Sequence, residues 1–129
     1  MLSIVSLFKG VHPRKPTAHI VVSSHLDPRW VSTFENYYKG IKTPHRENVK
    51  KLFDSLIEPL ESDKDWTYSI ADICFFSRWW DDQPSSIRER FKSLISNRQI
   101  EFVNGGWVAN DEATVYYEDI IENFRLGYF

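Results

Sequence analysis

The sequence has a single cysteine, Cys74, and almost no excess of charge of either sign. One cysteine excludes an intrachain disulfide, and its setting in "DICFFSRWW" favours a buried, unreactive thiol. Sixteen basic against eighteen acidic residues give a net charge of -2. The basic surface that typically binds nucleic acid or an anionic membrane is therefore missing, and we expect neither partner.

Long apolar runs and internal repeats are missing as well. The N-terminal stretch "LSIVSLF" is too short to span a membrane and lacks both a basic flank before it and an evident cleavage site, so we expect no signal peptide. The prolines of "GVHPRKPT" predict an irregular N-terminal arm over residues 1–17. With 42% hydrophobic and 16% aromatic residues, the remaining chain, residues 18–129, has the composition of one globular domain.

Strand and helix patterns alternate along residues 18–129. The β-branched run "AHIVVSS" predicts a strand over 18–24, and residues 31–40 predict a short helix that ends near Gly40. Thr43 and Pro44 suit the start of a second helix. Its apolar residues recur at three-and-four spacing: Val49, Leu52, Phe53, Leu56, Ile57 and Leu60.

In the second half of the sequence, a strand pattern followed by a helix pattern occurs twice more. "WTYSIA" predicts a strand, and Ser86 with Glu89 has capping-box spacing at the start of a helix, while "FFSRWW" is read as helix packing. "IEFV" predicts a third strand, and "NGGWVAND" predicts a loop in which Asp111 is the N-cap of a last helix. That helix has an apolar stripe of Ala113, Tyr116, Tyr117, Ile120, Ile121 and Phe124.

Three strands that alternate with helices predict an α/β fold with a parallel sheet, because parallel neighbours need long crossover connections. We expect a partial parallel β/α barrel, truncated after its first three β/α units. Such an open sheet has an unpaired edge and an uncovered apolar face, which favour association with another chain.

His25 and Asp27 follow the first predicted strand. In an extended chain, side chains at positions i and i+2 project to the same face, so both can reach one ion. Imidazole nitrogen and carboxylate oxygen suit zinc, and the carboxyl end of a barrel strand is where catalytic groups are carried. The pair supplies only two ligands, however, and its spacing is common by chance. Alternatively, Asp27 before Pro28 is a helix N-cap and His25 is an ordinary loop residue.

Three segments carry a resemblance that favours the zinc interpretation. "HLDPRWVSTFENYYKGIK", "YSIADICFFSRWWDD" and "IEFVNGGWVANDEATVYY" resemble, in order and approximate spacing, the N-terminal part of glycoside hydrolase family 38, the retaining α-mannosidases, and the lysosomal branch in particular. The resemblance covers residues 18–129. It implies a seven-stranded β/α barrel with one zinc ion, with His25 and Asp27 as two metal ligands and Trp30 as a substrate-binding residue.

The resemblance also implies the function. We expect a zinc-dependent hydrolase of terminal α-mannose on glycoprotein N-glycans, located in lysosomes or vacuoles, with a mannose-containing glycan as its partner. The family nucleophile lies in an Ile-Asp-Pro-Phe-Gly-His segment expected beyond Phe129, so no catalytic residue is assigned here and the chain alone is expected to be inactive. Ser23, Leu26 and Arg29 depart from the family pattern.

Two alternatives stay open. The protein is alternatively a non-catalytic carbohydrate-binding or partner-binding remnant, and Trp30 is alternatively a residue of the hydrophobic core.

Overall fold

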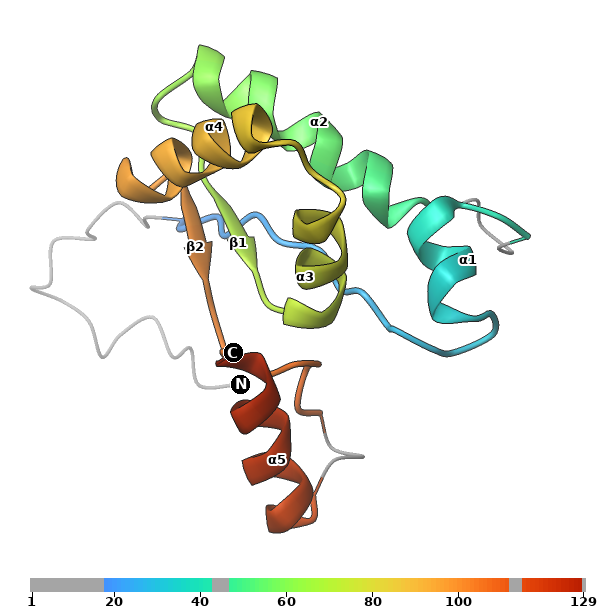
Figure 1. Cartoon of the computed structure of the whole chain (residues 1–129). Helices are drawn as coiled ribbons and strands as arrows, with labels where there is room; N and C mark the ends of the chain where they lie inside the picture. Colours follow the sequence, from blue (N-terminus) through green and yellow to red (C-terminus); the bar gives the residue numbers. More distant parts are fainter. Residues whose placement is uncertain (1–17, 43–46, 112–114, 129) are drawn as a thin grey trace, which may run out of the picture.

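The computed structural model describes residues 18–42, 47–111 and 115–128. The predicted N-terminal arm over residues 1–17 lies outside them. Within the described residues, five helices and two strands follow in the order α1 (Phe34–Lys39), α2 (Val49–Ser62), β1 (Tyr68–Ile70), α3 (Ile73–Asp81), α4 (Ser85–Ser96), β2 (Ile100–Phe102) and α5 (Tyr117–Gly127). The helices α2 and α4 pack side by side over the strands, and α5 stands beyond the carboxyl end of β2 (Figure 1).

The two strands pair in parallel, with Tyr68 opposite Ile100, so the α/β class with parallel pairing is confirmed. The predicted strand over 18–24 is wrong as a regular strand. Its chain runs beside β1 (Figure 1), but it pairs only through an isolated bridge between Ser23 and Ser69. Ile20 is 83% exposed, and a β-branched run gains little from strand geometry when no layer covers its side chains. A two-stranded sheet does not by itself form the predicted part of a barrel.

The first two helices show how local chemistry sets their ends. The side chain of Thr33 accepts a hydrogen bond from the backbone N–H of Asn36 at 3.2 Å, and Gly40 ends α1 with a φ of 69°. This confirms the predicted end near Gly40, because the left-handed region favours glycine. Helix α2 begins after Asn48, not after Thr43, which lies outside the described residues.

The starts of the later helices differ from the predictions. Pro84 is the N-cap of α4 and its carbonyl accepts the first helical bonds, so Ser86 lies inside the first turn and the capping box with Glu89 is wrong. Helix α5 begins at Tyr117 with Tyr116 as its N-cap, so the N-cap role predicted for Asp111 is wrong too. In both cases the helix begins at another residue than the polar one that the pattern favours, and the N-cap side chain makes no capping hydrogen bond.

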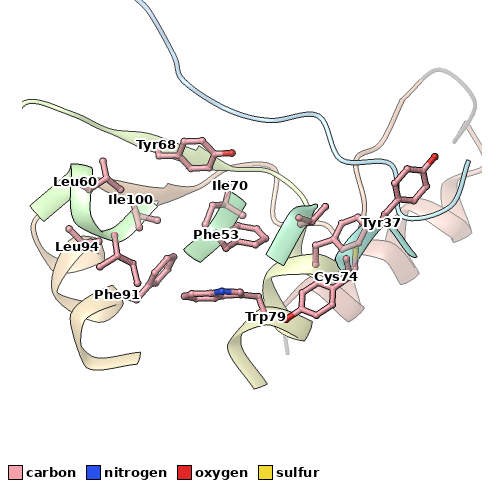
Figure 2. Close-up of a cluster of buried hydrophobic side chains, with 14 residues drawn as sticks. Tyr37, Phe53, Leu60, Tyr68, Ile70, Cys74, Trp79, Phe91, Leu94 and Ile100 are labelled. Carbon is pink, nitrogen blue, oxygen red and sulfur yellow. The ribbon is translucent and has the colours of Figure 1, made fainter. Parts of the chain in front are cut away.

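Aromatic side chains of α2, α3 and α4 form the centre of the core (Figure 2). The ring of Trp79 lies 5.7 Å from that of Phe53 and 5.0 Å from that of Phe91, and all three residues are fully buried. The indole Nε1–H donates to Oδ1 of Asp54 at 2.8 Å, which satisfies the one polar atom of the Trp79 side chain. The packing role predicted for "FFSRWW" is confirmed.

Cys74 lies in the same core. It is 2% exposed, and burial raises the pKa of its thiol to about 12. Because the thiolate is the reactive form, this environment keeps the side chain inert, as predicted.

The apolar stripe predicted for α5 is only partly buried: Ile120 and Phe124 are half-buried, and Ala113 lies outside the described residues. Tyr117 is 63% exposed and Ile121 is 62% exposed, whereas the one buried residue of this helix is the polar Asn123. Its side chain accepts from the N–H of Val108 at 2.9 Å and donates to the Val108 carbonyl and to Oδ1 of Asn110, both at 2.8 Å. Polar contacts to the loop after β2 therefore help to hold α5, while Tyr117 and Ile121 of its apolar stripe remain exposed.

An ion-pair cluster joins α1 to the end of α3. The Arg78 guanidinium binds both Glu35 and Asp82, and the buried hydroxyl of Tyr38 donates to Oδ2 of Asp82 at 2.7 Å. The pKa of Asp82 is lowered, first by the Tyr38 hydroxyl and then by Arg78. The pKa of Glu35 is lowered, first by the ammonium of Lys39 and then by Arg78.

Phe91→Ala should lower the free energy of unfolding by about 3–5 kcal/mol, because it leaves a cavity among packed rings. Chemical denaturation of the purified chain measures this. The control, Ile121→Ala, removes an exposed apolar side chain and should change the free energy by less than about 0.5 kcal/mol. Equal effects of the two substitutions would contradict the placement of the core.

Arg78→Met should make the chain less stable above pH 4.5, the ordinary pKa of Glu35, and this difference should shrink as the pH falls. Both carboxyl pKa values are lowered in the folded state, so their contribution is present above their ordinary values and is lost as the pH falls through the folded values. Denaturation curves at about pH 6 and about pH 3 test this. Lys92→Met, which removes an exposed pair with Glu89, is the control and should show no comparable pH dependence.

Candidate metal and sugar site

The carboxyl ends of β1 and β2 and the end of segment 18–24 lie at one edge of the sheet. His25 and Asp27 stand there, held near β1 by a 2.6 Å hydrogen bond between the hydroxyls of Ser24 and Tyr68. Nε2 of His25 lies 3.3 Å from Oδ1 of Asp27. The two side chains therefore do share one face, as the extended spacing predicts, although the segment is not a regular strand.

A cavity of about 190 Å³ brings together the three residues singled out in the sequence. His25, Asp27 and Trp30 all contribute to its wall. The remaining lining residues are Leu26, Tyr37, Glu47, Val49 and Phe75. The site thus combines an imidazole, a carboxylate and an indole over a floor formed by the edge of the core.

Two of the alternative interpretations are wrong, whereas His25 lies outside any helix or strand, so its interpretation as an ordinary loop residue stays a prediction. Asp27 is not a helix N-cap, because α1 begins seven residues later and is capped by Thr33. Trp30 is not a core residue, because it is 73% exposed. Side-chain exposures of 73% for His25 and 49% for Asp27 leave both polar groups accessible to a ligand.

Asp72 is a member of this site that the sequence analysis missed. It follows β1, is 3% exposed, and lies close enough to His25 and Asp27 for their charges to act on its carboxyl group. Burial raises its pKa, while the backbone N–H groups of Leu26 and Ala109 lower it. The available signal was its position directly after a strand, two residues beyond Ile70, where site residues of parallel sheets gather.

The donor set fits part of a zinc site. One imidazole nitrogen and one carboxylate oxygen converge, and both are ligand types that zinc accepts. Within residues 18–42, 47–111 and 115–128, no group of three or more His, Cys, Asp and Glu residues is arranged to hold a metal ion. Among the described residues, the convergence at this site is therefore limited to two side chains of ligand type.

The neighbouring departures from the family pattern have structural roles. Ser23 donates its hydroxyl hydrogen to the carbonyl of Ser69 at 2.9 Å and so fastens the segment to β1. Leu26 is partly buried and packs against the core, while Arg29 is exposed. Ser23 and Leu26 therefore anchor the segment, while the side chains of His25 and Asp27 remain exposed.

A larger cavity, of about 730 Å³, lies away from this site between α3, α4, β2 and α5. Its walls are mostly apolar and include Phe76, Trp80, Phe102, Trp107 and Tyr128. None of the His and Asp residues discussed above lines it; its ionisable lining residues are Lys92 and Tyr128.

Among the described residues, none of the helices has the length and apolar character that crossing a bilayer requires.

Comparison with known proteins gives a consistent result. Residues 15–128 match the sequence model of the glycosyl hydrolases family 38 N-terminal domain. Alpha-mannosidase C of Dictyostelium discoideum is 40% identical over 84% of this chain, and human lysosomal alpha-mannosidase is 36% identical over 91% of it. Alpha-mannosidase of Canavalia ensiformis is 36% identical over 92%. The matched region is 10% of the first of these relatives and 12% of the other two.

Trp30→Ala should change the free energy of unfolding by less than about 0.5 kcal/mol, because the indole is mostly in solvent. Trp79→Ala is the matched tryptophan control and should lower it by about 3–5 kcal/mol. Urea denaturation followed by circular dichroism measures both variants. A large loss of stability in the Trp30 variant would contradict its place on the wall of an open site.

Proposed function

Because this chain belongs to glycosyl hydrolase family 38, we propose that it is the N-terminal portion of the catalytic barrel of a zinc-dependent retaining α-mannosidase. The substrate class is terminal α-mannose on glycoprotein N-glycans. The observation that carries the proposal is the convergence of His25 and Asp27, whose ligand atoms lie 3.3 Å apart in a cavity that Trp30 also lines. The names of the matched relatives, all alpha-mannosidases, support the same substrate class.

Each of the three residues has a role in this proposal. His25 and Asp27 would hold the zinc ion, which when bound would supply Lewis-acid binding of the mannose hydroxyls. The exposed indole of Trp30 packs against the C–H face of the sugar and excludes water from that side. Together the chain's residues select the sugar by the axial position of its 2-hydroxyl and orient its ring.

Retaining hydrolysis needs a nucleophile and an acid/base carboxyl about 5 Å apart. The sequence of 129 residues does not contain the Asp-Pro-Phe-Gly-His segment that carries the family nucleophile. We therefore propose that this polypeptide by itself binds but does not hydrolyse α-mannosides. For location, the lysosomal names of matched relatives favour a lysosome or vacuole.

A second candidate function, a non-catalytic carbohydrate-binding or partner-binding protein, rests on one observation. Helix α5 and the residues around it expose Val115, Tyr116, Tyr117, Ile121 and Tyr128. An apolar surface of this kind favours association. Size-exclusion chromatography and mannose titration separate the two: a stable oligomer without mannose affinity supports the second candidate.

His25→Ala should weaken zinc binding at least tenfold, because it removes one of the two ligands in the chain. Equilibrium dialysis of the purified polypeptide against zinc measures this, and His19→Ala, which changes an exposed histidine outside the site, is the control. Equal affinities of the two variants would contradict the metal assignment.

With zinc present, the unmodified 129-residue chain should release no aryl alcohol from an aryl α-mannoside. Measurable turnover by the purified chain would overturn the proposal that hydrolysis needs a nucleophile from elsewhere. Chelation of zinc should also weaken mannose binding, measured by the quenching of Trp30 fluorescence relative to the Trp30→Ala variant.

A further inference from the structure

A further cavity, of about 450 Å³, lies between segment 18–24, the C-terminal half of α2 and the start of β1. We call it the α2 groove. Its walls are mostly apolar and include Ile20, Val22, Leu56, Trp66 and Tyr68. Ile20 is 83% exposed, Trp66 58% and Val22 50%. The groove thus presents large apolar side chains that the described residues leave in solvent.

One wall of the α2 groove belongs to the segment that leads to His25 and Asp27. This segment is fastened to β1 at Ser69, whose N–H donates to the carbonyl of Val22 at 2.8 Å and whose carbonyl accepts from the hydroxyl of Ser23 at 2.9 Å. A group that packs against Ile20 and Val22 from the groove side would therefore stabilise the attachment of the whole segment.

The N-terminal stretch over residues 2–8, "LSIVSLF", has the composition that such a groove accepts. It lies outside the described residues. Its apolar members are Leu2, Ile4, Val5, Leu7 and Phe8. Burial of apolar side chains is the main favourable term when two surfaces associate, so this stretch and the exposed groove are matched in kind.

Chain connectivity brings this stretch within reach of the α2 groove. Residues 9–19 join it to Ile20, and a linker of this length spans up to about 35 Å when extended. Gly10, Pro13 and Pro16 in the linker are residues that favour turns. A short tether raises the effective concentration to the order of millimolar, so the chain's own stretch is favoured over that of a second copy.

Charges on the two sides are complementary. The linker carries Lys9, Arg14 and Lys15. The groove wall includes Asp65, and the exposed residues 58–65 around it contain more acidic than basic side chains: Glu58, Glu61, Asp63 and Asp65 against Lys64. Opposite charges of this kind favour the approach of two surfaces and set their orientation.

We propose that residues 2–8 occupy the α2 groove of their own chain, with their apolar side chains against Ile20, Val22 and Trp66. The docked stretch holds segment 18–24 against β1 and so steadies the backbone that continues into His25 and Asp27. This role goes beyond the proposed hydrolase function and does not depend on zinc.

A spin label at residue 6 of the full chain locates the stretch. Ser6→Cys supplies the attachment point, while Cys74 stays unlabelled because it is 2% exposed and its thiol has a pKa raised to about 12. The label should broaden the backbone amide NMR signals of Val22, Leu56 and Trp66 and leave that of Ile121 on α5 sharp. Sharp signals at all three groove residues would overturn the proposal.

A mixed sample separates the two possible sources of the stretch. Spin-labelled chains without isotope are combined with isotope-labelled chains that carry no spin label. Signals at the groove should then stay sharp, because the label and the observed groove are on different chains. Broadening in this sample would assign the groove to the stretch of a second copy and overturn docking within one chain.

Amide hydrogen exchange tests the consequence for the segment. Ile4→Asp should speed exchange of the Ser69 N–H at least about tenfold, because the bond to the Val22 carbonyl opens more often once the groove is vacated. The N–H of Val103, which donates to the Ile70 carbonyl at 2.9 Å, should be unchanged and shows that the strands stay paired.

Val11→Asp is the matched control, since it makes the same kind of change in the linker, outside residues 2–8. It should leave exchange of the Ser69 N–H within about twofold of the unmodified chain. Equal exchange at Ser69 in the Ile4→Asp and Val11→Asp variants would contradict the proposed docking.

Discussion

The parallel pairing of β1 with β2 is the constraint on which the site depends. With Tyr68 opposite Ile100, both strands point the same way, and the bridge from Ser23 to Ser69 brings the preceding segment alongside them. Every loop that leaves a strand in this direction emerges at one edge, which is where ligands bind in parallel α/β sheets. His25, Asp72 and the loop after β2 are far apart in sequence and meet only because the register sets their strands side by side.

The aromatic core keeps this edge in place. Trp79 of α3, Phe53 of α2 and Phe91 of α4 share one buried cluster, so three helices are fixed relative to one another and to the strands below them. The start of α3 lies at the site, and its first N–H groups are satisfied by the loop after β2. Core packing and site geometry are therefore connected through a single helix, which carries the buried Trp79 and begins directly after Asp72.

Polar contacts, by contrast, hold the last helix. Asn123 bonds both backbone groups of Val108, and Gly127 approaches the backbone of Gly105 so closely that a Cβ atom there would lie 2.1 Å from the Gly105 carbonyl oxygen. These contacts fix the loop at Trp107 from the α5 side while α3 holds it from the other. On the apolar face of α5, Ile120 and Phe124 are half-buried, while Tyr117 and Ile121 are exposed.

The sequence alone determined the features that depend on neighbours along the chain: the end of α1 at Gly40, the apolar stripe of α2, the buried thiol of Cys74, and the shared face of His25 and Asp27. Local backbone geometry and side-chain periodicity suffice for these. Only the tertiary structure decided that segment 18–24 is not a regular strand, that α5 leaves its stripe exposed and that Trp30 faces solvent. It also decided that Asp72 belongs to the site. Two properties depend on contacts with groups that are distant in sequence: the burial of a side chain, and whether a polar residue at a helix start accepts a hydrogen bond from the helix. No local sequence pattern encodes those contacts.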